Sequence, residues 1–265
     1  MAFTYLCAPF SVSAQSADSL ALEALRLERE IFVAPSAADA NVALLAKAEV
    51  RKQQGLYEEA VRELGRLNAW ALSEEQSGAY YYQKALCQYL AADFEGALST
   101  LDEARLYIPS TSAIHSELSL LEALAAGEQG EWVRSEQAAN RLLANAPEEV
   151  KMEVKKLYAN APKLRNPMVA WYLSLVPGVG QFYAGEVWSG IVSLAINGGL
   201  IAFGVGEAVA GHWLSAWLGT GIPLSNTYFV GQERARLLTE RRNARVLRTH
   251  NDLLREILLQ ERYNE

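Results

Sequence analysis

The chain has 265 residues, 51% apolar and 21% charged, which is typical of one large or two modest globular domains. Its charge is zoned: residues 1–165 hold 23 acidic and 16 basic side chains, whereas residues 166–265 hold eight of each. The net negative charge of residues 1–165 argues against nucleic acid as the main partner. The two cysteines, Cys7 and Cys87, are too few for a disulfide framework, and no Cys/His spacing predicts a zinc site.

The first 17 residues carry no charge, and residues 3–12 form an apolar run. Val12-Ser13-Ala14 before Gln15 fits a small-x-small cleavage site, so residues 1–15 are predicted to be a secretory signal peptide. No Lys or Arg lies near Met1, which leaves an uncleaved apolar arm as the alternative. The run is too short to cross a membrane by itself.

Residues 17–161 show helical periodicity, with Ala, Leu, Glu and Arg dominant and few prolines. Three segments within them resemble one another: residues 55–60, 92–97 and 130–135. The last residue of each segment is small, and these positions, 60, 97 and 135, are 37 and 38 residues apart. Another small residue stands 12 positions before each of them. The spacing predicts helical hairpins that repeat along the chain.

These residues resemble the tetratricopeptide repeat, which pairs two antiparallel helices in each unit. The resemblance implies that the small residues let the two helices approach and that an aromatic residue packs at the turn between them. Pro109 and Pro147 are expected to stop the second helices. An unrelated array of helical hairpins is the alternative. The predicted packing residues are Ala48, Gly55, Tyr57, Ala60, Ala85, Phe94, Ala97, Trp132 and Ser135.

A helical solenoid of this kind typically binds a peptide or a protein on its concave surface, so an unidentified protein or peptide is the predicted partner. The run Tyr80-Tyr81-Tyr82 is a candidate contact, although consecutive helical residues point in different directions and some of these rings are expected in the core. His115 stands alone in the sequence and is expected at the surface.

Residues 166–232 differ sharply from the rest of the chain. They contain two charged residues, Glu186 and Glu207, together with 12 of the 18 glycines and four of the six tryptophans. Such a composition predicts a transmembrane domain of two to three helices in a lipid bilayer. Apolar stretches cover residues 168–185, 189–210 and 213–230. The first is interrupted at Pro177-Gly178 and the third at residues 219–223, and each is either a kinked span or a re-entrant loop.

The most specific motif in the chain lies at the first interruption. It resembles the P-G-x-G-Q-x-Y-x-G signature of a small bacterial membrane domain of unknown function that is common in Bacteroidetes and similar to two-transmembrane-helix domains. The resemblance covers residues 164–232 and implies a membrane-embedded helical hairpin with no assigned chemistry. The signature residues are Pro177, Gly178, Gly180, Gln181, Tyr183 and Gly185.

Two interpretations of this motif remain open. In one, Gln181, Tyr183 and Asn197 line a polar site inside the membrane, with Glu186 or Glu207 nearby. In the other, the glycines allow a tight turn and close helix packing, and Gln181 and Asn197 form hydrogen bonds between helices. The second interpretation is favoured. Glycine-rich helices also pack well against a second copy, so a homo-oligomer is a further candidate assembly.

Residues 233–265 predict an Arg-rich amphipathic helix. Its apolar stripe suits interfacial binding, self-association or a partner helix, with a solvated helix as the alternative. Basic residues that directly follow an apolar span indicate the cytoplasmic side of a membrane. The arginines of this cluster are Arg234, Arg236, Arg241, Arg242, Arg245 and Arg248.

The sequence therefore predicts an all-α protein: a tetratricopeptide-like repeat domain, a Gly-rich transmembrane segment and a C-terminal amphipathic helix. The predicted function is non-enzymatic, that of a scaffold or adaptor at the bacterial cell envelope. The expected location is the inner membrane, with periplasmic repeats, three crossings and a cytoplasmic C-terminus. Without a signal peptide, cytoplasmic repeats and an even number of crossings fit instead. The alternative function is a subunit of a small transport or channel-like assembly with a polar site around Gln181, Tyr183 and Glu186. No catalytic residue, cofactor or metal site is predicted.

Overall fold

A computed structural model describes residues 17–109 and 112–264, and the predicted signal peptide at residues 1–15 lies outside these ranges. The described residues form helices joined by turns and loops, with no β-strand among them, which confirms the all-α class. The chain divides into two compact units, one ending at Val154 and the other beginning at Lys155.

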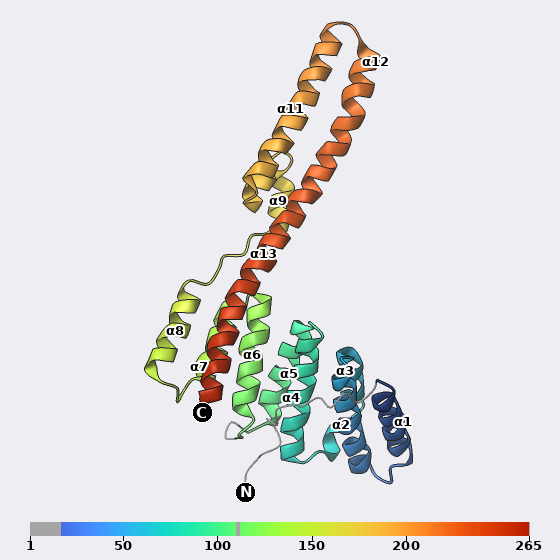
Figure 1. The fold of residues 1–265 in the computed structure, drawn as a ribbon, viewed down its shortest axis with the longest axis vertical. Coiled ribbons are helices and arrows are strands. Elements are labelled where there is room, and N and C mark those ends of the chain that lie inside the picture. Colours follow the sequence, from blue (N-terminus) through green and yellow to red (C-terminus); the bar gives the residue numbers. More distant parts are fainter. Residues whose placement is uncertain (1–16, 110–111, 265) are drawn as a thin grey trace. The chain divides into compact units, whose positions relative to one another are not determined.

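The first unit is a row of helices, each packed on the next along the chain from α1 to α7 (Figure 1). Short turns join α2 to α3, α4 to α5 and α6 to α7, so within each of these pairs the second helix folds back on the first. Helix α8, Glu148–Ala159, crosses the unit boundary, and Pro147 directly precedes it instead of ending α7. The helices before it are α1 (Ala17–Val33), α2 (Ala37–Gln53), α3 (Tyr57–Leu64), the 3-10 turn η1 (Ala69–Ala71), α4 (Glu74–Leu90), α5 (Phe94–Tyr107), α6 (His115–Gln129) and α7 (Trp132–Leu142).

Three helical hairpins, α2–α3, α4–α5 and α6–α7, repeat at the spacing read from the sequence. Each has a left-handed residue in its turn: Gly55 with φ of 74°, Ala92 with φ of 60° and Gly130 with φ of 74°. Each second helix begins two residues later, at positions 57, 94 and 132. A left-handed residue reverses the chain after a helix end, so the 37- and 38-residue spacing is a repeat of one turn geometry. Membership of the tetratricopeptide family stays a prediction.

Small residues line the contact inside each hairpin. Ala48, Ala85 and Ala123 on the first helices are buried, as are the small residues at positions 60, 97 and 135 on the second helices. In the third hairpin Ser135 Oγ donates a hydrogen bond to the carbonyl oxygen of Ala123 at 2.6 Å. Side chains of this size let two helix backbones approach closely, which is the role expected of them from the sequence.

The aromatic residues of the repeats divide between core and turn. Tyr80 and Tyr81 are buried and belong to the core of the first unit, whereas Tyr82 packs against it only partly buried. Phe94 is half-buried at the start of α5, and its ring centroid lies 5.5 Å from that of Tyr89. The tyrosine run is therefore a packing element more than an exposed contact.

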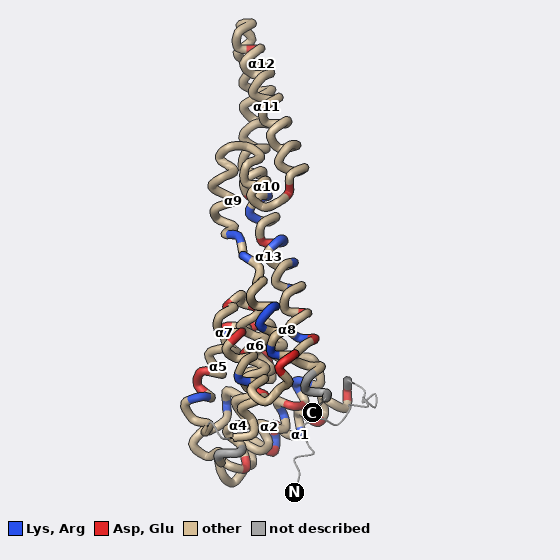
Figure 2. Tube along the Cα trace, turned by 90° about the vertical axis from the view of Figure 1, so that its left-hand side faces the viewer, with Lys and Arg blue, Asp and Glu red and all other residues tan. Residues whose placement is uncertain are grey.

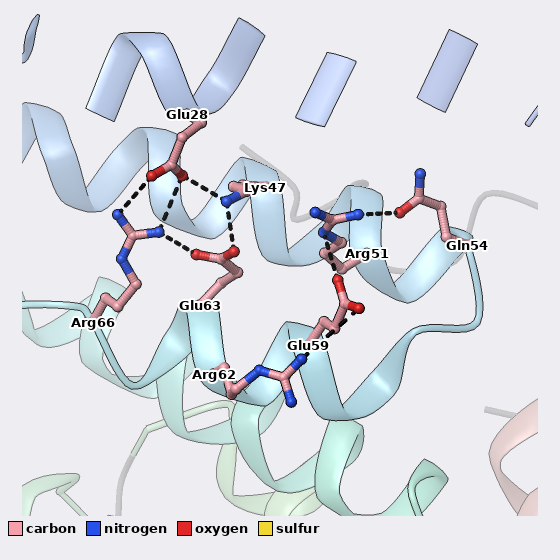
Figure 3. A network of polar contacts seen from close by, with 8 residues as sticks. All are labelled: Glu28, Lys47, Arg51, Gln54, Glu59, Arg62, Glu63 and Arg66. Atoms are coloured by element: carbon pink, nitrogen blue, oxygen red, sulfur yellow. Dashed lines mark hydrogen bonds and ion pairs between the residues drawn. The ribbon is translucent and has the colours of Figure 1, made fainter. Parts of the chain in front are cut away.

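Ion pairs join α1 to the first hairpin (Figure 3). Lys47 on α2 is only 5% exposed, and its Nζ lies 2.6 Å from a carboxylate oxygen of Glu28 and 2.5 Å from one of Glu63. Arg66 donates to both of these carboxylates. Hydrogen bonds from Arg66 and Lys47 lower the pKa of Glu28 to about 2. A buried cation thus has anionic partners on two neighbouring helices, as a charge removed from water requires.

The second unit contains the Gly-rich segment and the C-terminal helix. Its helices after α8 are α9 (Pro167–Leu173), α10 (Val179–Ala184), α11 (Val187–Val209), α12 (Trp213–Ala216), the π-helical turn η2 (Trp217–Gly221) and α13 (Ile222–Asn264). Taken element by element, α11 is the one helix of the described residues that is long and apolar enough to cross a membrane, and α12 and α13 do not meet this test as separate helices. Figure 2 shows that the end of the second unit that contains α11 and α12 is almost free of charged residues.

The first apolar stretch, residues 168–185, is not one continuous span. It forms α9 and α10, of seven and six residues, which pack on each other and on α13. At 1.5 Å per residue each is roughly 10 Å long, far short of the roughly 30 Å of bilayer hydrocarbon. The first stretch is therefore a pair of short helices and not one continuous helix.

The third stretch, by contrast, continues without a break into the C-terminal helix. The helical run passes through α12, η2 and α13 from residue 213 to residue 264, and α13 alone has 43 residues. Residues 219–223 do not interrupt it: η2 is a π turn directly before Pro223, which cannot donate the usual helical hydrogen bond. The third apolar stretch and the Arg-rich tail are thus parts of one helix, which packs on α11 (Figure 1).

Candidate functional site

The glycines of the P-G-x-G-Q motif bring four helices together. Gly178 has φ of +91°, and a Cβ on it would lie 2.6 Å from the carbonyl oxygen of Gly190 on α11. A Cβ on Gly180 would lie 2.2 Å from the carbonyl oxygen of Ala170 on α9 and 2.9 Å from Ala235 Cβ on α13. All three distances are shorter than a Cβ atom permits. The motif therefore packs α10 against α9, α11 and α13 at backbone distance.

Gly185 and Tyr183 finish the short helix and hold the preceding linker. Gly185 ends α10 with φ of +91°. The backbone N–H of Asn166 donates to the Tyr183 hydroxyl at 3.2 Å. Arg165 donates to the Tyr183 carbonyl oxygen, and its guanidinium lies 5.6 Å from the centre of the Tyr183 ring. Tyr183 thus fixes the linker and does not face the polar cavity described next.

Gln181 and Asn197 form hydrogen bonds between helices. Gln181 is 1% exposed, and its Nε2 donates to the Gly231 carbonyl oxygen on α13 at 2.9 Å. Asn197 on α11 is 2% exposed and accepts a 2.9 Å hydrogen bond from Thr227 Oγ1 on α13. These contacts agree with the packing interpretation of the two residues.

A cavity of about 130 Å³ nevertheless remains between α10, α11 and α13. Most of its surface is apolar, and we call it the polar cavity because polar side chains from all three helices line it. Within the described chain, Gln181 Oε1 and Ser189 Oγ are buried and have no hydrogen-bond partner. Neither Tyr183 nor Glu186 lines the cavity. The lining residues are Gln181, Ser189, Val192, Ser193, Ile196, Asn197, Thr227, Val230 and Arg234.

Sequence reasoning identified Gln181 and Asn197 but missed Ser189, Ser193 and Thr227. The signal was present: positions 189, 193 and 197 are four residues apart and share one face of a helix. Three polar residues on one face of an otherwise apolar helix indicate that this face meets protein or a ligand, and not lipid.

The arginines of the C-terminal cluster have different surroundings. Arg236 pairs with Glu233 and with Glu240. The Arg242 side chain lies beside Gly185, and its Nη1 is buried without a partner among the described residues. Arg234 lines the polar cavity. The remaining members, Arg241, Arg245 and Arg248, are exposed.

In the first unit, a charged cavity of about 550 Å³ opens beside the last hairpin. Glu122 on α6, 2% exposed, pairs there with Arg105 from α5 and with Arg141 from α7, the latter at 2.6 Å. Arg134 Nε also lies 2.9 Å from Glu122. The lining residues are Leu101, Arg105, His115, Ser116, Leu118, Ser119, Glu122, Arg141, Leu142, Ala144 and Asn145.

This cavity has an excess of positive charge, because Arg105 and Arg141 share one carboxylate. Guanidinium groups bind carboxylates and phosphates through paired hydrogen bonds. The residues that form the cavity were not identified from the sequence, since they come from three helices and their charges alternate with acids along the chain. His115, expected at the surface, is half-buried and belongs to the lining.

No protein-family model, curated protein or solved structure matches this chain.

Proposed function

We propose that this protein is a membrane-anchored interaction protein: α11 and the apolar part of the following helix hold it in a lipid bilayer, and the helical stack α1–α7 binds a protein partner. The observation that carries the proposal is the exposed apolar surface of α11, a 23-residue helix roughly 35 Å long. Large apolar side chains stay exposed along its length. They include Ile191, Leu194, Ile201, Phe203 and Val205.

The burial of α11 supports a lipid environment. A core helix of a soluble protein buries most of its apolar residues, whereas the most apolar window of α11 is only 11% buried. At roughly 25 cal/mol per Å² of exposed apolar surface, such a helix is unfavourable in water and stable in hydrocarbon. Its N–H and C=O groups are satisfied within the helix, which a membrane requires.

The stack of hairpins supports partner binding. Its charged cavity contains two guanidinium groups with one carboxylate between them, and it is large enough for several side chains of a peptide. We expect the partner to present an acidic segment, because carboxylates could complete the hydrogen bonding of Arg105 and Arg141.

The membrane topology favoured by this geometry has two crossings. The earlier expectation of three crossings needs residues 168–185 to span the bilayer, but α9 and α10 are too short and pack on each other. With α11 and the apolar part of the 213–264 helical run as the crossings, the repeats and the arginine cluster emerge on one side. By the positive-inside rule this side is the cytoplasm. We therefore place the repeats in the cytoplasm and not in the periplasm.

Photocrosslinking tests the interaction function. A photoreactive amino acid replaces Ser116, which lines the charged cavity, or Val33, which is exposed at the end of α1 as a matched control. We expect a defined protein adduct from position 116 in membranes of cells that make the full chain. The adduct should disappear when Arg141→Glu is added, and the partner identified from it should bind the purified chain. Equal adducts from both positions, or none, would argue against the proposal.

The polar cavity favours a second candidate, a subunit of a transport or channel-like assembly. Gln181 lines that cavity, but the cavity lies within one chain and does not include Tyr183 or Glu186. Solute flux through vesicles reconstituted with the full chain, lost on Gln181→Ala, would favour this candidate over the interaction protein.

A further inference from the structure

The polar cavity between α10, α11 and α13 has hydrogen-bonding capacity that the described residues do not use. Gln181 Oε1 is a buried acceptor without a partner, and its amide orientation follows from the hydrogen bond that Nε2 donates to Gly231. Ser189 Oγ is also buried and unpartnered within the described chain. Buried polar atoms without a partner are rare in proteins and indicate a bound water, ion or ligand.

The cavity also has a cation. Arg234 lines it and is exposed, while the nearby acids Glu233 and Glu240 both pair with Arg236. A ligand that matches the cavity therefore needs an anionic group for Arg234 and a hydrogen-bond donor for Gln181 Oε1. Ser189 can donate or accept.

The surroundings of the cavity indicate a lipid. Val192, Ile196 and Val230 line it and are themselves exposed, at 37%, 48% and 65%. Its open side is therefore apolar, and in the proposed membrane anchor this side meets acyl chains. The volume of about 130 Å³ holds about four waters. That space suits a small headgroup, while the chains of a lipid lie outside along the apolar rim.

The position of the cavity along the helices agrees with a headgroup. Ser189 stands in the first turn of α11, next to Glu186, and Arg234 belongs to the first turn of basic residues after the apolar segment. Both residues lie where a span meets the interface, which is the level of lipid phosphates.

We propose that this cavity binds the headgroup of an anionic phospholipid that carries a free hydroxyl, the phosphatidylglycerol class. The phosphate pairs with Arg234 and accepts a hydrogen bond from Ser189. A headgroup hydroxyl donates to Gln181 Oε1. The site rests on the proposed membrane anchoring but is independent of partner binding by the helical stack.

Native mass spectrometry of the purified full chain in detergent tests this site. Phosphatidylglycerol, phosphatidylmethanol and phosphatidylcholine are titrated separately, since the second has the charge without the hydroxyl and the third has no net charge. We expect phosphatidylglycerol to bind about fivefold more tightly than phosphatidylmethanol, because the latter leaves the buried Gln181 acceptor unpaired. Phosphatidylcholine should bind more weakly still.

Two variants and a control locate the binding. Arg234→Gln is expected to weaken phosphatidylglycerol binding about fivefold by removing the cation, and Ser189→Leu is expected to abolish it by filling the cavity. Arg241→Gln removes an exposed arginine of the same helix outside the lining and should change nothing. Membrane retention of each variant is measured in parallel, so a failed anchor is distinguished from a failed lipid site.

Three results would overturn the lipid site. Equal binding of the three lipids would show no headgroup recognition. Equal effects of Arg234→Gln and Arg241→Gln would show only general attraction by the arginine cluster. Full displacement by glycerol phosphate would assign the cavity to a soluble phosphate ester.

Discussion

Equivalent positions in two of the hairpins hold buried residues of opposite charge. Lys47 and Glu122 occupy the same place in the first and third hairpins, one residue before Ala48 and Ala123. Both are buried, yet one is a cation with carboxylate partners and the other a carboxylate with three arginine partners. In both hairpins this position therefore holds a buried charged residue with ion-pair partners. The residue is a cation in the first hairpin and an anion in the third.

The glycines of the apolar segment differ in the space that surrounds them. Gly178→Ala should destabilise the fold, since its left-handed backbone alone costs about 1–2 kcal/mol with a Cβ and that Cβ would lie 2.6 Å from the Gly190 carbonyl oxygen. The matched control is Gly198→Ala, because a Cβ there meets nothing within 4 Å. We expect the control to be neutral or up to about 1 kcal/mol more stable, as Ala favours helix over Gly. Thermal unfolding in detergent, followed by circular dichroism, measures both.

Similar melting temperatures for Gly178→Ala and Gly198→Ala would contradict the close approach of α10 to α11. The comparison is informative because both changes add the same methyl group to the same apolar segment.

At the scale of elements, length separates the roles of the apolar helices. Helix α11 is long enough to cross a bilayer, whereas α9 and α10 are each a third of its length or less and rest on α13. The helical run of residues 213–264 is continuous: it begins in the apolar segment and ends in the charged tail. A continuous helix of this kind connects the apolar segment directly to the arginine cluster.

Helix α11 carries the element-scale prediction. Ile201→Arg places a charge near the middle of the helix on an exposed side chain, at a cost of about 2.5–3.5 kcal/mol in hydrocarbon. We expect a smaller fraction of the protein to resist extraction from membranes with carbonate. Val33→Arg, at an exposed apolar position of α1, should leave that fraction unchanged. If both variants resist extraction as well as the original chain, α11 does not lie in lipid.

On the scale of the whole molecule, the number of crossings decides which compartment the repeats occupy. Two crossings return the chain to the side from which it entered, so residues before 165 and after 233 share one compartment. In the proposed topology, the loop at residues 210–212, between α11 and α12, lies on the other side. The proposed function then concerns cytoplasmic partners.

Thiol labelling tests this topology. Single cysteines replace Val133, His212 or Arg248, all exposed, in a chain with Cys7→Ser. The remaining Cys87 is 1% exposed, and burial raises the pKa of its thiol to about 11, so it should react slowly in the folded protein. With a membrane-impermeant maleimide on intact cells whose outer envelope admits the reagent, we expect labelling at position 212 alone. Positions 133 and 248 should label only after lysis.

Labelling of position 133 but not 248 in intact cells would instead support three crossings and periplasmic repeats. Denatured samples control for thiols that are accessible but unreactive.

The helical class, the hairpin repeat and the apolar segment can all be predicted from the sequence. Each of them follows from a local signal: periodicity for the helices, glycine or small residues at the 37- and 38-residue spacing for the turns, and the near absence of charge for the apolar segment. Such features depend on residues close together in the chain, where spacing alone sets the geometry.

How the apolar stretches divide, and which polar residues meet, depends on packing between segments that are distant in the chain. Residues 168–185 are as long and apolar as a span, but close contacts at Gly178 and Gly180 fold them into two short helices. Gln181 and Arg234 are 53 positions apart and reach one cavity because α10 packs on α13. Arg105, Glu122 and Arg141 likewise meet only when three helices stack. Long-range packing brings such groups together, and the residues near each group in the sequence give no sign of these contacts.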